Sequence, residues 1–191
     1  KPFKTEQTEI GLKYDGGRVG GSVSVFQSDK PVYGVDGSNT YTQVDDQTNR
    51  GLEIMAFGKA SKTVTVLGGI SFLNTDVDGK DAIGAPQRQA NVGVEWSPEQ
   101  LTGFAFETRA LYTSSQYANS ANTQEVPSWT RLDMGVRYVM PVGNDQALTL
   151  RARLDNVTDR NYWASAGGFP GFGYLTIGNP RTLTVSASLD F

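Results

Sequence analysis

Strict alternation of apolar and polar residues over long segments constrains the fold of this chain more than any other feature. In the final segment, "RTLTVSASLDF" (181–191), every second side chain from Leu183 to Phe191 is apolar and those between are polar. Successive side chains of a β-strand point to opposite faces of a sheet. The segment therefore predicts a strand with one apolar and one polar face, ending on an aromatic residue.

The same alternation recurs along the chain and predicts nine strands, whereas helical periodicity is nearly absent. Most of the predicted strands reach the roughly 9–11 residues that a tilted strand needs to cross a bilayer. Strands of ordinary globular proteins average only about 5–6 residues. The predicted strands cover residues 5–14, 17–30, 48–58, 63–74, 88–97, 103–114, 130–140, 147–157 and 181–191.

The connections between these strands alternate in length. Short ones at 15–17, 58–62, 97–102 and 141–146 are separated by long ones at 31–47, 75–87, 115–129 and 158–180. Short turns at one end and long loops at the other are typical of outer-membrane barrels. Aromatic residues that would form an interfacial girdle lie beside the short turns or at the terminus: Tyr14, Trp96, Phe104, Tyr138 and Phe191.

Charged residues occupy the other face of the predicted strands. They are Glu95, Glu107, Arg109, Arg131, Asp133, Arg137, Arg151, Arg153, Asp155 and Asp190. The dry core of a β-sandwich could not hold so many charges without large desolvation costs. The polar lumen of a barrel can, and the alternation then points residues such as Val92, Val94, Trp96, Leu132, Val136, Leu150 and Leu154 at lipid. The predicted fold class is all-β, an antiparallel transmembrane β-barrel segment.

Composition excludes several functions. The net charge is −3 and the basic residues are scattered, which argues against a nucleic-acid partner. The chain has no Cys and no His, so zinc sites and His-based triads are excluded, and no catalytic carboxylate pair stands out. The segment "DVDGKD" (76–81) resembles the start of a calcium loop, but Gly is missing at the sixth position and Glu at the twelfth, so it predicts a solvated acidic loop. We therefore expect neither an enzyme nor a metal site.

An odd number of strands is informative, because single-chain bacterial barrels have even counts. Nine strands predict that residues 1–191 are the C-terminal portion of a larger barrel. A smaller complete barrel, a pore or an adhesin, remains an alternative if the true count is eight or ten. A soluble β-rich module that binds carbohydrate through loop aromatics is the other alternative.

Several segments resemble TonB-dependent siderophore receptors, especially those for ferric hydroxamate-type siderophores. They are "EIGLKYD" (9–15), "NRGLEI" (49–54), "YTSSQYANSANT" (112–123), "VPSWTRLDMGVRY" (126–138), "LRARLDNVTDRNYWAS" (150–165) and "GNPRTLTVSASLDF" (178–191). Such receptors are 22-stranded barrels with a plugged lumen. The resemblance implies that these are the last nine strands, with the plug domain outside this chain.

The resemblance also implies a function and partners. The protein would import a ferric siderophore across the outer membrane of a Gram-negative bacterium, with TonB engaging an N-terminal region that this chain lacks. Outer-membrane lipid would surround the barrel, and Phe191 would be the aromatic terminus that the barrel assembly machinery recognises. The ferric siderophore is the transported ligand, and no resident cofactor is implied.

The long connection "NYWASAGGFPGFGYLTIG" (161–178) is the richest candidate for ligand binding. Aromatic walls with few charges suit a weakly charged organic chelate. The candidate residues are Tyr162, Trp163, Phe169, Phe172 and Tyr174, with Tyr117 and Trp129 from the preceding long loop. Tyr33 and Tyr41 are weaker candidates in the connection 31–47. Packing of these aromatics on one another is the competing interpretation.

Overall fold

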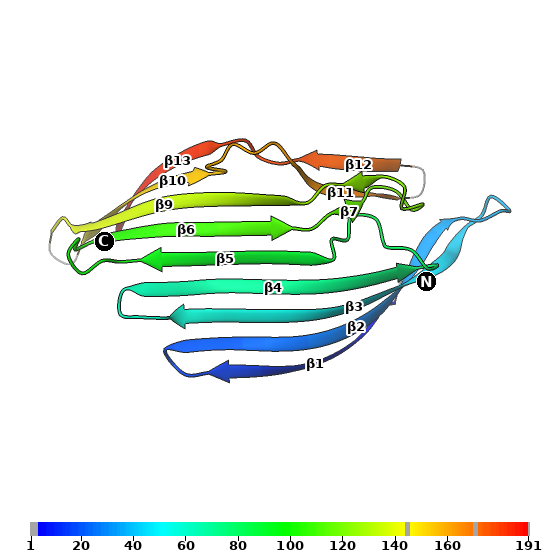
Figure 1. Ribbon diagram of the computed structural model, residues 1–191, viewed down its shortest axis with the longest axis horizontal. Helices are drawn as coiled ribbons and strands as arrows, with labels where there is room; N and C mark the ends of the chain where they lie inside the picture. Colours follow the sequence, from blue (N-terminus) through cyan, green and yellow to red (C-terminus); the bar gives the residue numbers. More distant parts are fainter. Residues whose placement is uncertain (1–3, 144–145, 170–171, 191) are drawn as a thin grey trace.

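A single antiparallel sheet dominates the structure, a computed structural model that describes residues 4–143, 146–169 and 172–190, with Phe169 and Phe172 described by their backbone alone. The sheet has nine strands, and their spatial order β1-β2-β3-β4-β5-β6-β9-β10-β13 follows the chain (Figure 1). β1 and β13 form its two edges and are not paired with each other. The strands are β1 (Glu6–Asp15), β2 (Val19–Val35), β3 (Tyr41–Lys59), β4 (Val64–Val77), β5 (Arg88–Trp96), β6 (Phe104–Thr113), β9 (Trp129–Pro141), β10 (Ala147–Asp155) and β13 (Thr182–Asp190).

The prediction of nine long strands is confirmed, with boundaries close to those read from the alternation. Short turns join the strands at one end of the sheet and the longer connections lie at the other (Figure 1). Among the described residues, no helix is long and apolar enough to cross a membrane.

Three of the predicted long loops contain more regular structure than expected. The prediction that residues 31–47 form a loop is wrong for most of this segment, because β2 continues to Val35 and β3 begins at Tyr41. Its β3 part carries polar residues on both faces and its β2 part, residues 31–35, carries few polar residues on either, so the ladder persists where the alternation that reveals strands is missing. The connection 158–180 contains a hairpin of β11 (Trp163–Phe169) and β12 (Phe172–Ile177). A third connection holds the short pair β7 (Gln116–Tyr117) and β8 (Glu125–Val126).

The tip of the β2–β3 hairpin is shaped by Asp36. Its carboxylate accepts hydrogen bonds from the Ser38 hydroxyl at 2.7 Å and from the backbone N–H groups of Ser38 and Thr40, each at 2.9 Å. The Ser38 hydroxyl and these N–H groups hold the pKa of the Asp36 carboxyl below its ordinary value. The side chain thus closes the turn that the sequence did not reveal.

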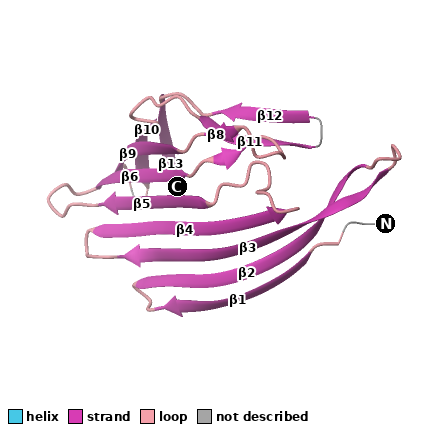
Figure 2. Ribbon diagram, turned by 45° about the vertical axis from the view of Figure 1, so that its right-hand side comes forward, coloured by secondary structure: helices cyan, strands magenta, loops and turns pink. Residues whose placement is uncertain are grey.

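The register places the predicted lipid-facing residues on one face, here called the apolar face. Val136 pairs with Ala152 on one side and Phe106 on the other, and Phe106 pairs with Trp96. Large side chains on this face stay exposed, with Leu150 at 40% and Val185 at 71%. The buried apolar residues of the described chain are instead four small ones, Ala82, Ala105, Val126 and Ala166. No second layer covers the apolar face within the described residues (Figure 2).

Aromatic residues of the apolar face gather beside the short turns. Phe104 and Tyr138 stack with ring centroids 4.4 Å apart, and Trp96 and Phe106 lie 5.7 Å apart. Tyr14 is 66% exposed at the first short turn. This is the arrangement of an interfacial girdle at one membrane boundary. Phe191, the remaining predicted member, lies outside the described residues.

Candidate functional site

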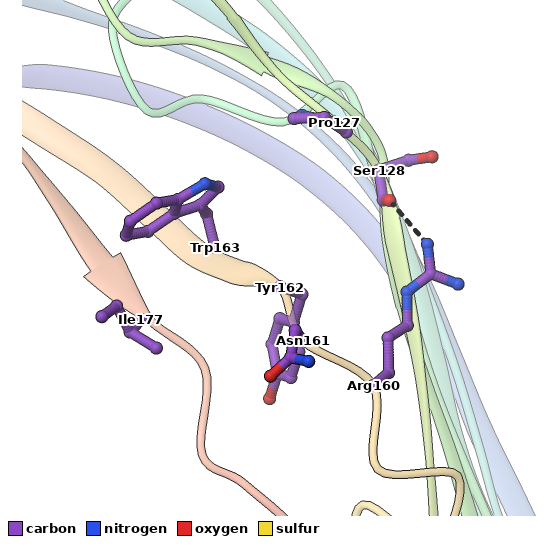
Figure 3. A pocket seen from close by; sticks show the side chains of 7 residues that line it. All are labelled: Pro127, Ser128, Arg160, Asn161, Tyr162, Trp163 and Ile177. Atoms are coloured by element: carbon purple, nitrogen blue, oxygen red, sulfur yellow. Dashed lines mark hydrogen bonds between the residues drawn. The ribbon is translucent and has the colours of Figure 1, made fainter.

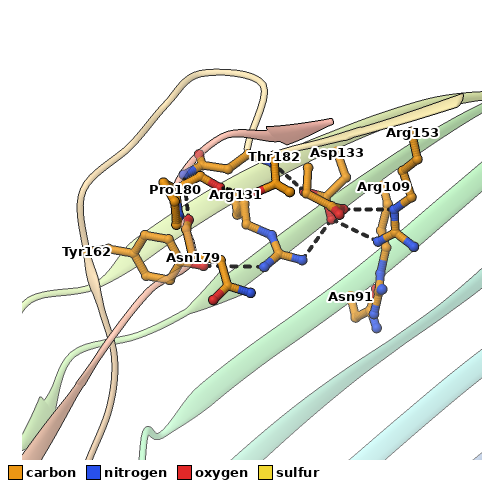
Figure 4. Close-up of polar contacts among 11 residues, drawn as sticks. Asn91, Arg109, Arg131, Asp133, Arg153, Tyr162, Asn179, Pro180 and Thr182 are labelled. Carbon is orange, nitrogen blue, oxygen red and sulfur yellow. Dashed lines mark hydrogen bonds and ion pairs between the residues drawn. The ribbon is translucent and has the colours of Figure 1, made fainter. Parts of the chain in front are cut away.

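The polar face of the sheet, defined by the side chains opposite to the apolar face, carries a set of ion pairs. Arg137 of β9 reaches across β6 to Glu95, with 2.9 Å between its guanidinium and the carboxylate. Arg109 donates to the Asn91 side chain at 2.7 Å (Figure 4). The polar and charged side chains predicted for a lumen therefore pair between strands of the sheet, in one case across an intervening strand.

The most deeply buried charged group of this face is the Asp133 carboxylate, whose side chain is only 2% exposed. The Arg131 guanidinium lies 2.9 Å from it and that of Arg153 lies 3.6 Å from it. Figure 4 shows both arginines directed at Asp133, Arg131 from the same strand and Arg153 from the neighbouring strand β10. Its second oxygen accepts a 2.9 Å hydrogen bond from the backbone N–H of Asn156. One buried carboxylate thereby ties β9 and β10 to the start of the connection between β10 and β13.

Asn156 closes the base of that connection. Its side-chain amide donates to the carbonyl oxygens of Arg160 at 2.9 Å and Asn179 at 3.0 Å, and its oxygen accepts from the Arg160 N–H at 2.9 Å. The residue is fully buried and has a φ of 53°, a left-handed conformation that asparagine tolerates better than most residues. Both ends of the 157–180 segment are thus held at one point, and the hairpin of β11 and β12 projects from it.

Two predicted site residues meet beside this anchor. The Tyr162 ring packs on the Trp129 indole with centroids 4.5 Å apart and an interplanar angle of 37°. The Arg131 guanidinium donates a long hydrogen bond of 3.4 Å to the Tyr162 hydroxyl. The Trp129 Nε1–H and the Arg131 Nε–H are buried and have no partner among the described residues. This corner of the polar face therefore combines aromatic surface with unused hydrogen-bond donors.

A cavity of about 420 Å³ adjoins this corner. It lies between residues 127–128 at the start of β9 and residues 160–163, with Ile177 across the hairpin (Figure 3). The Arg160 guanidinium bridges the gap and donates to the Ser128 carbonyl oxygen at 3.4 Å. Trp163 is 41% exposed and pairs with Ile177, which is 71% exposed. The cavity is thus mostly apolar, with one cation at its edge.

The remaining predicted residues are distributed differently. Tyr174 is 60% exposed and crosses the hairpin over Gly167, where an added Cβ would lie 2.5 Å from its ring. Tyr117 lies apart from the Tyr162–Trp129 pair, in β7, and its carbonyl oxygen accepts from the Gly84 N–H at 2.9 Å. The side chains of Phe169 and Phe172 lie outside the described part of the structure.

The long connections nonetheless pack against one another. Gly84, at a φ of +69°, approaches the Ala166 carbonyl so closely that any side chain there would collide with it. The Asn122 side chain joins the connection 115–129 to the connection 75–87. It accepts a hydrogen bond from the Asp81 N–H at 2.9 Å and donates one to the Asp81 carbonyl oxygen at 3.0 Å. Three long connections therefore form one cluster at the end of the sheet opposite to the short turns.

The acidic segment 76–81 forms a turn in this cluster. Asp76 accepts a hydrogen bond from the Gly79 N–H at 3.2 Å, and Val77 forms an isolated bridge with Lys80. Among the described residues, no group of three or more acidic, His or Cys side chains lies close enough to hold a metal ion. The segment acts as a turn.

Sequence reasoning missed the anchor made by Asn156 and Arg160. Asn156 follows the last alternating residue of β10 and lies in a polar run, "DNVTDRN" (155–161), that is typical of any turn. Its partner Asn179 is 23 residues away in the chain. The only local signal is this polar run, which predicts a turn but not the hydrogen bond from Asn156 to Asn179 that holds the two ends of the connection together.

Comparison with known proteins places this arrangement in context. A family model described as TonB dependent receptor-like, beta-barrel, matches residues 1–157. The ferrichrome receptor FcuA of Yersinia enterocolitica is 36% identical over 98% of this chain and 26% of its own length. The ferrichrome outer membrane transporter/phage receptor of Escherichia coli K12 is 27% identical over 100% of this chain and 27% of its own length.

A solved structure shows the same architecture. The crystal structure of BauA, the ferric preacinetobactin receptor of Acinetobacter baumannii, superposes with a TM-score of 0.88 at 34% identity. The superposition covers 100% of this chain and 30% of that protein. The chain thus spans between a quarter and a third of the length of these relatives.

Proposed function

Because the chain belongs to the family of TonB-dependent receptor β-barrels, we propose that its long loops form part of the mouth through which a ferric siderophore is taken up. The chain is part of an outer-membrane barrel of Gram-negative bacteria, in a family of transporters that are not enzymes. Its apolar face accordingly contacts lipid and its polar face lines the lumen. The long-loop cluster then lies at the extracellular end.

The observation that carries the ligand proposal is the pairing of Tyr162 with Trp129 beside a cavity of about 420 Å³. Both rings belong to the polar face or to the hairpin base above it, so they border the path into the lumen. Unpaired N–H donors of Trp129 and Arg131 lie in the same corner. Because these donors are buried, the exposed parts of the two rings are the surface that an organic chelate would contact.

We further propose that the ligand is a ferric hydroxamate-type siderophore. FcuA and the Escherichia coli transporter are named for ferrichrome, which supports this chemical class. The segment from Asn161 to Pro180 contains no charged residue. A weakly charged chelate would therefore enter the loop cluster without electrostatic repulsion from the hairpin.

Three features of the complete protein are part of the same proposal. The nine strands would be the last ones of a larger barrel, with a plug domain encoded elsewhere in the protein. TonB would supply the energy by engaging a region outside these residues. Phe191 would be read by the barrel assembly machinery. The yield of assembled, heat-modifiable barrel from a Phe191→Ser variant would test the last point, with unchanged yield counting against it.

The test of ligand binding is a titration of ferric siderophore into the full-length protein with single substitutions to Ala at Trp129, Tyr162, Trp163 and Tyr174. Loss of a well-packed aromatic contact typically costs about 1–2 kcal/mol, or about five- to thirtyfold in affinity. Phe57→Ala is the matched control, since Phe57 is an exposed aromatic of the polar face near the short turns. Equal affinity in all four variants and the control would refute the proposed site.

A further inference from the structure

The apolar face ends along a sharp line on strands β2 to β5, at the long-loop end. Val25, Leu52 and Phe72 pair with one another in a row that closes the apolar band. The next row outward on the same face is polar, and Arg88 lies directly opposite Phe72 on β5. The members of this polar row are Gln27, Arg50 and Asn74, while Arg88 ends the row of Val25, Leu52 and Phe72 on β5.

A shallow, open depression of about 440 Å³, called the cavity below, lies at this line. Leu52 and Phe72 provide an apolar floor, and Phe72 is 42% exposed. Arg50 and Asn74 form a register pair at its outer side, and Arg88 lines it at the level of Phe72. The site therefore presents hydrocarbon toward the membrane interior and two cations toward the membrane surface.

Both guanidinium groups are available for a ligand. Arg50 donates through Nε to the Gln27 side chain at 3.0 Å, which fixes the guanidinium and leaves its terminal nitrogens free of hydrogen bonds to the described residues. The Arg88 backbone N–H is anchored by the Ser114 hydroxyl at 3.0 Å, while its side chain has no partner there. Neither arginine belongs to an ion pair within the described part of the chain.

Acidic residues lie one row farther from the membrane. Asp29 and Asp76 both pair with Thr48, and the Asp29 carboxylate is occupied by the hydroxyl of Thr48 at 2.7 Å and the amide of Gln27 at 3.2 Å. The positive charge is thus confined to the level of the cavity. An anion would be attracted to that level rather than to the strand ends beyond it.

We propose that this cavity binds the phosphorylated headgroup of an outer-leaflet lipid, with the acyl chains lying on Leu52 and Phe72. The inference rests on the membrane placement of the apolar face and is independent of the siderophore site. A guanidinium matches phosphate oxygens with paired donors, and basic pockets at the membrane surface bind phosphorylated headgroups. A free anion would use the arginines but gain nothing from the apolar floor, which favours an amphiphile.

The test uses the full-length protein in detergent micelles, with bis-phosphorylated lipid A as the probe and bound lipid measured by native mass spectrometry. The double variant Arg50→Gln/Arg88→Gln is expected to bind the probe about tenfold or more weakly, as expected for the loss of two interfacial cations. Arg151→Gln is the matched control, because it removes an exposed arginine from the polar face. It is expected to leave lipid binding unchanged.

Two further measurements identify the source of the phosphate. Lipid A stripped of both phosphates should bind the wild type and the double variant equally. Inorganic phosphate at millimolar concentration should not displace the probe. The proposal would be overturned if inorganic phosphate displaced the probe, or if the double variant bound intact lipid A as tightly as the wild-type protein does. Ferric siderophore binding measured on the same double variant should be unchanged, which separates this site from the mouth.

Discussion

The two faces of strand β9 share one backbone and obtain their partners in opposite ways. Val136 lies on the apolar face between its register partners Phe106 and Ala152. No second layer of the described chain covers it, so lipid covers its outer side. Arg137, the next residue, lies on the polar face and finds Glu95 two strands away, at 2.9 Å. The apolar face is covered by lipid, whereas the side chains of the polar face pair with specific residues within the protein.

The difference grows toward the long loops. On the polar face, Asp133 and Asn156 are almost fully buried and hold the hairpin base. On the apolar face at the same level, Met134 is 46% exposed. Lipid tolerates any apolar side chain of suitable size, so the apolar face needs composition rather than precise contacts. The polar face needs defined geometry, and the proposed binding corner is built on it.

Replacement of Asp133 by Ala should have the largest effect on stability. The change leaves the half-buried Arg131 cation and the buried Asn156 N–H without their shared acceptor. Breaking such a pair by removing one partner typically costs about 3–5 kcal/mol. The measurement is the urea unfolding midpoint of the full-length protein folded into lipid vesicles. Asp155→Ala, which removes the 2.8 Å partner of Arg153 at a more exposed position, should cost about 1 kcal/mol or less. Equal losses would show that burial of Asp133 carries no special weight.

Arginine substitutions at two adjacent positions should separate the faces directly. Val136→Arg places a cation toward lipid near mid-membrane and should cost about 2–4 kcal/mol in the same unfolding assay. Gly135→Arg points to the polar face, where a Cβ would lie 3.5 Å from the nearest Glu107 carboxylate oxygen and 3.5 Å from the Ala152 carbonyl. Because Glu107 can pair with the new cation, this variant should lose about 1 kcal/mol or less. A larger loss at Gly135 than at Val136 would contradict the assignment of the faces.

Loss of the Asn156 side chain should loosen the base of the β11–β12 hairpin without altering the nine-stranded sheet. Asn156→Gly keeps the left-handed backbone accessible and removes the three hydrogen bonds to Arg160 and Asn179. We expect a local cost of about 1–3 kcal/mol, seen as faster amide exchange in residues 157–180. Asn119→Gly is the control, since Asn119 also makes three side-chain bonds, all within residues 119–124. Its effect should stay there, and accelerated exchange in residues 157–180 would contradict the assigned role of Asn156.

The contrast between the faces also explains what the sequence predicted well. Every residue of a membrane strand meets either lipid or the lumen, so the alternation through Leu132, Met134 and Val136 predicts both the strand and the face that it turns to lipid. Where both faces of a strand meet water, this signal vanishes. The sequence therefore predicts a loop where β2 extends to Val35 and β3 begins at Tyr41.

The binding corner was only partly predictable. Tyr162, Trp163 and Trp129 were recognised as aromatics in long connections, and two of them prove to be in contact. Their grouping depends on Asn156 and Asn179, which are distant in the chain and polar like any turn residue. Tyr117 carries the same sequence signal yet lies in β7, apart from them. Residue type indicates which side chains suit a ligand, while long-range hydrogen bonds decide which of them meet.

The smallest expected effect is that of the Tyr162 hydroxyl. Tyr162→Phe keeps the ring on Trp129 and loses only the 3.4 Å hydrogen bond from Arg131, which is long for such a contact. The affinity for ferric siderophore should fall by about twofold, equivalent to roughly 0.5 kcal/mol. Tyr162→Leu removes the aromatic pair as well and should weaken binding by a further two- to tenfold. Titration of both variants separates the ring from its hydroxyl. If Phe weakens binding as much as Leu, the hydroxyl itself contacts the ligand and the unpaired donors of this corner matter more than its aromatic surface.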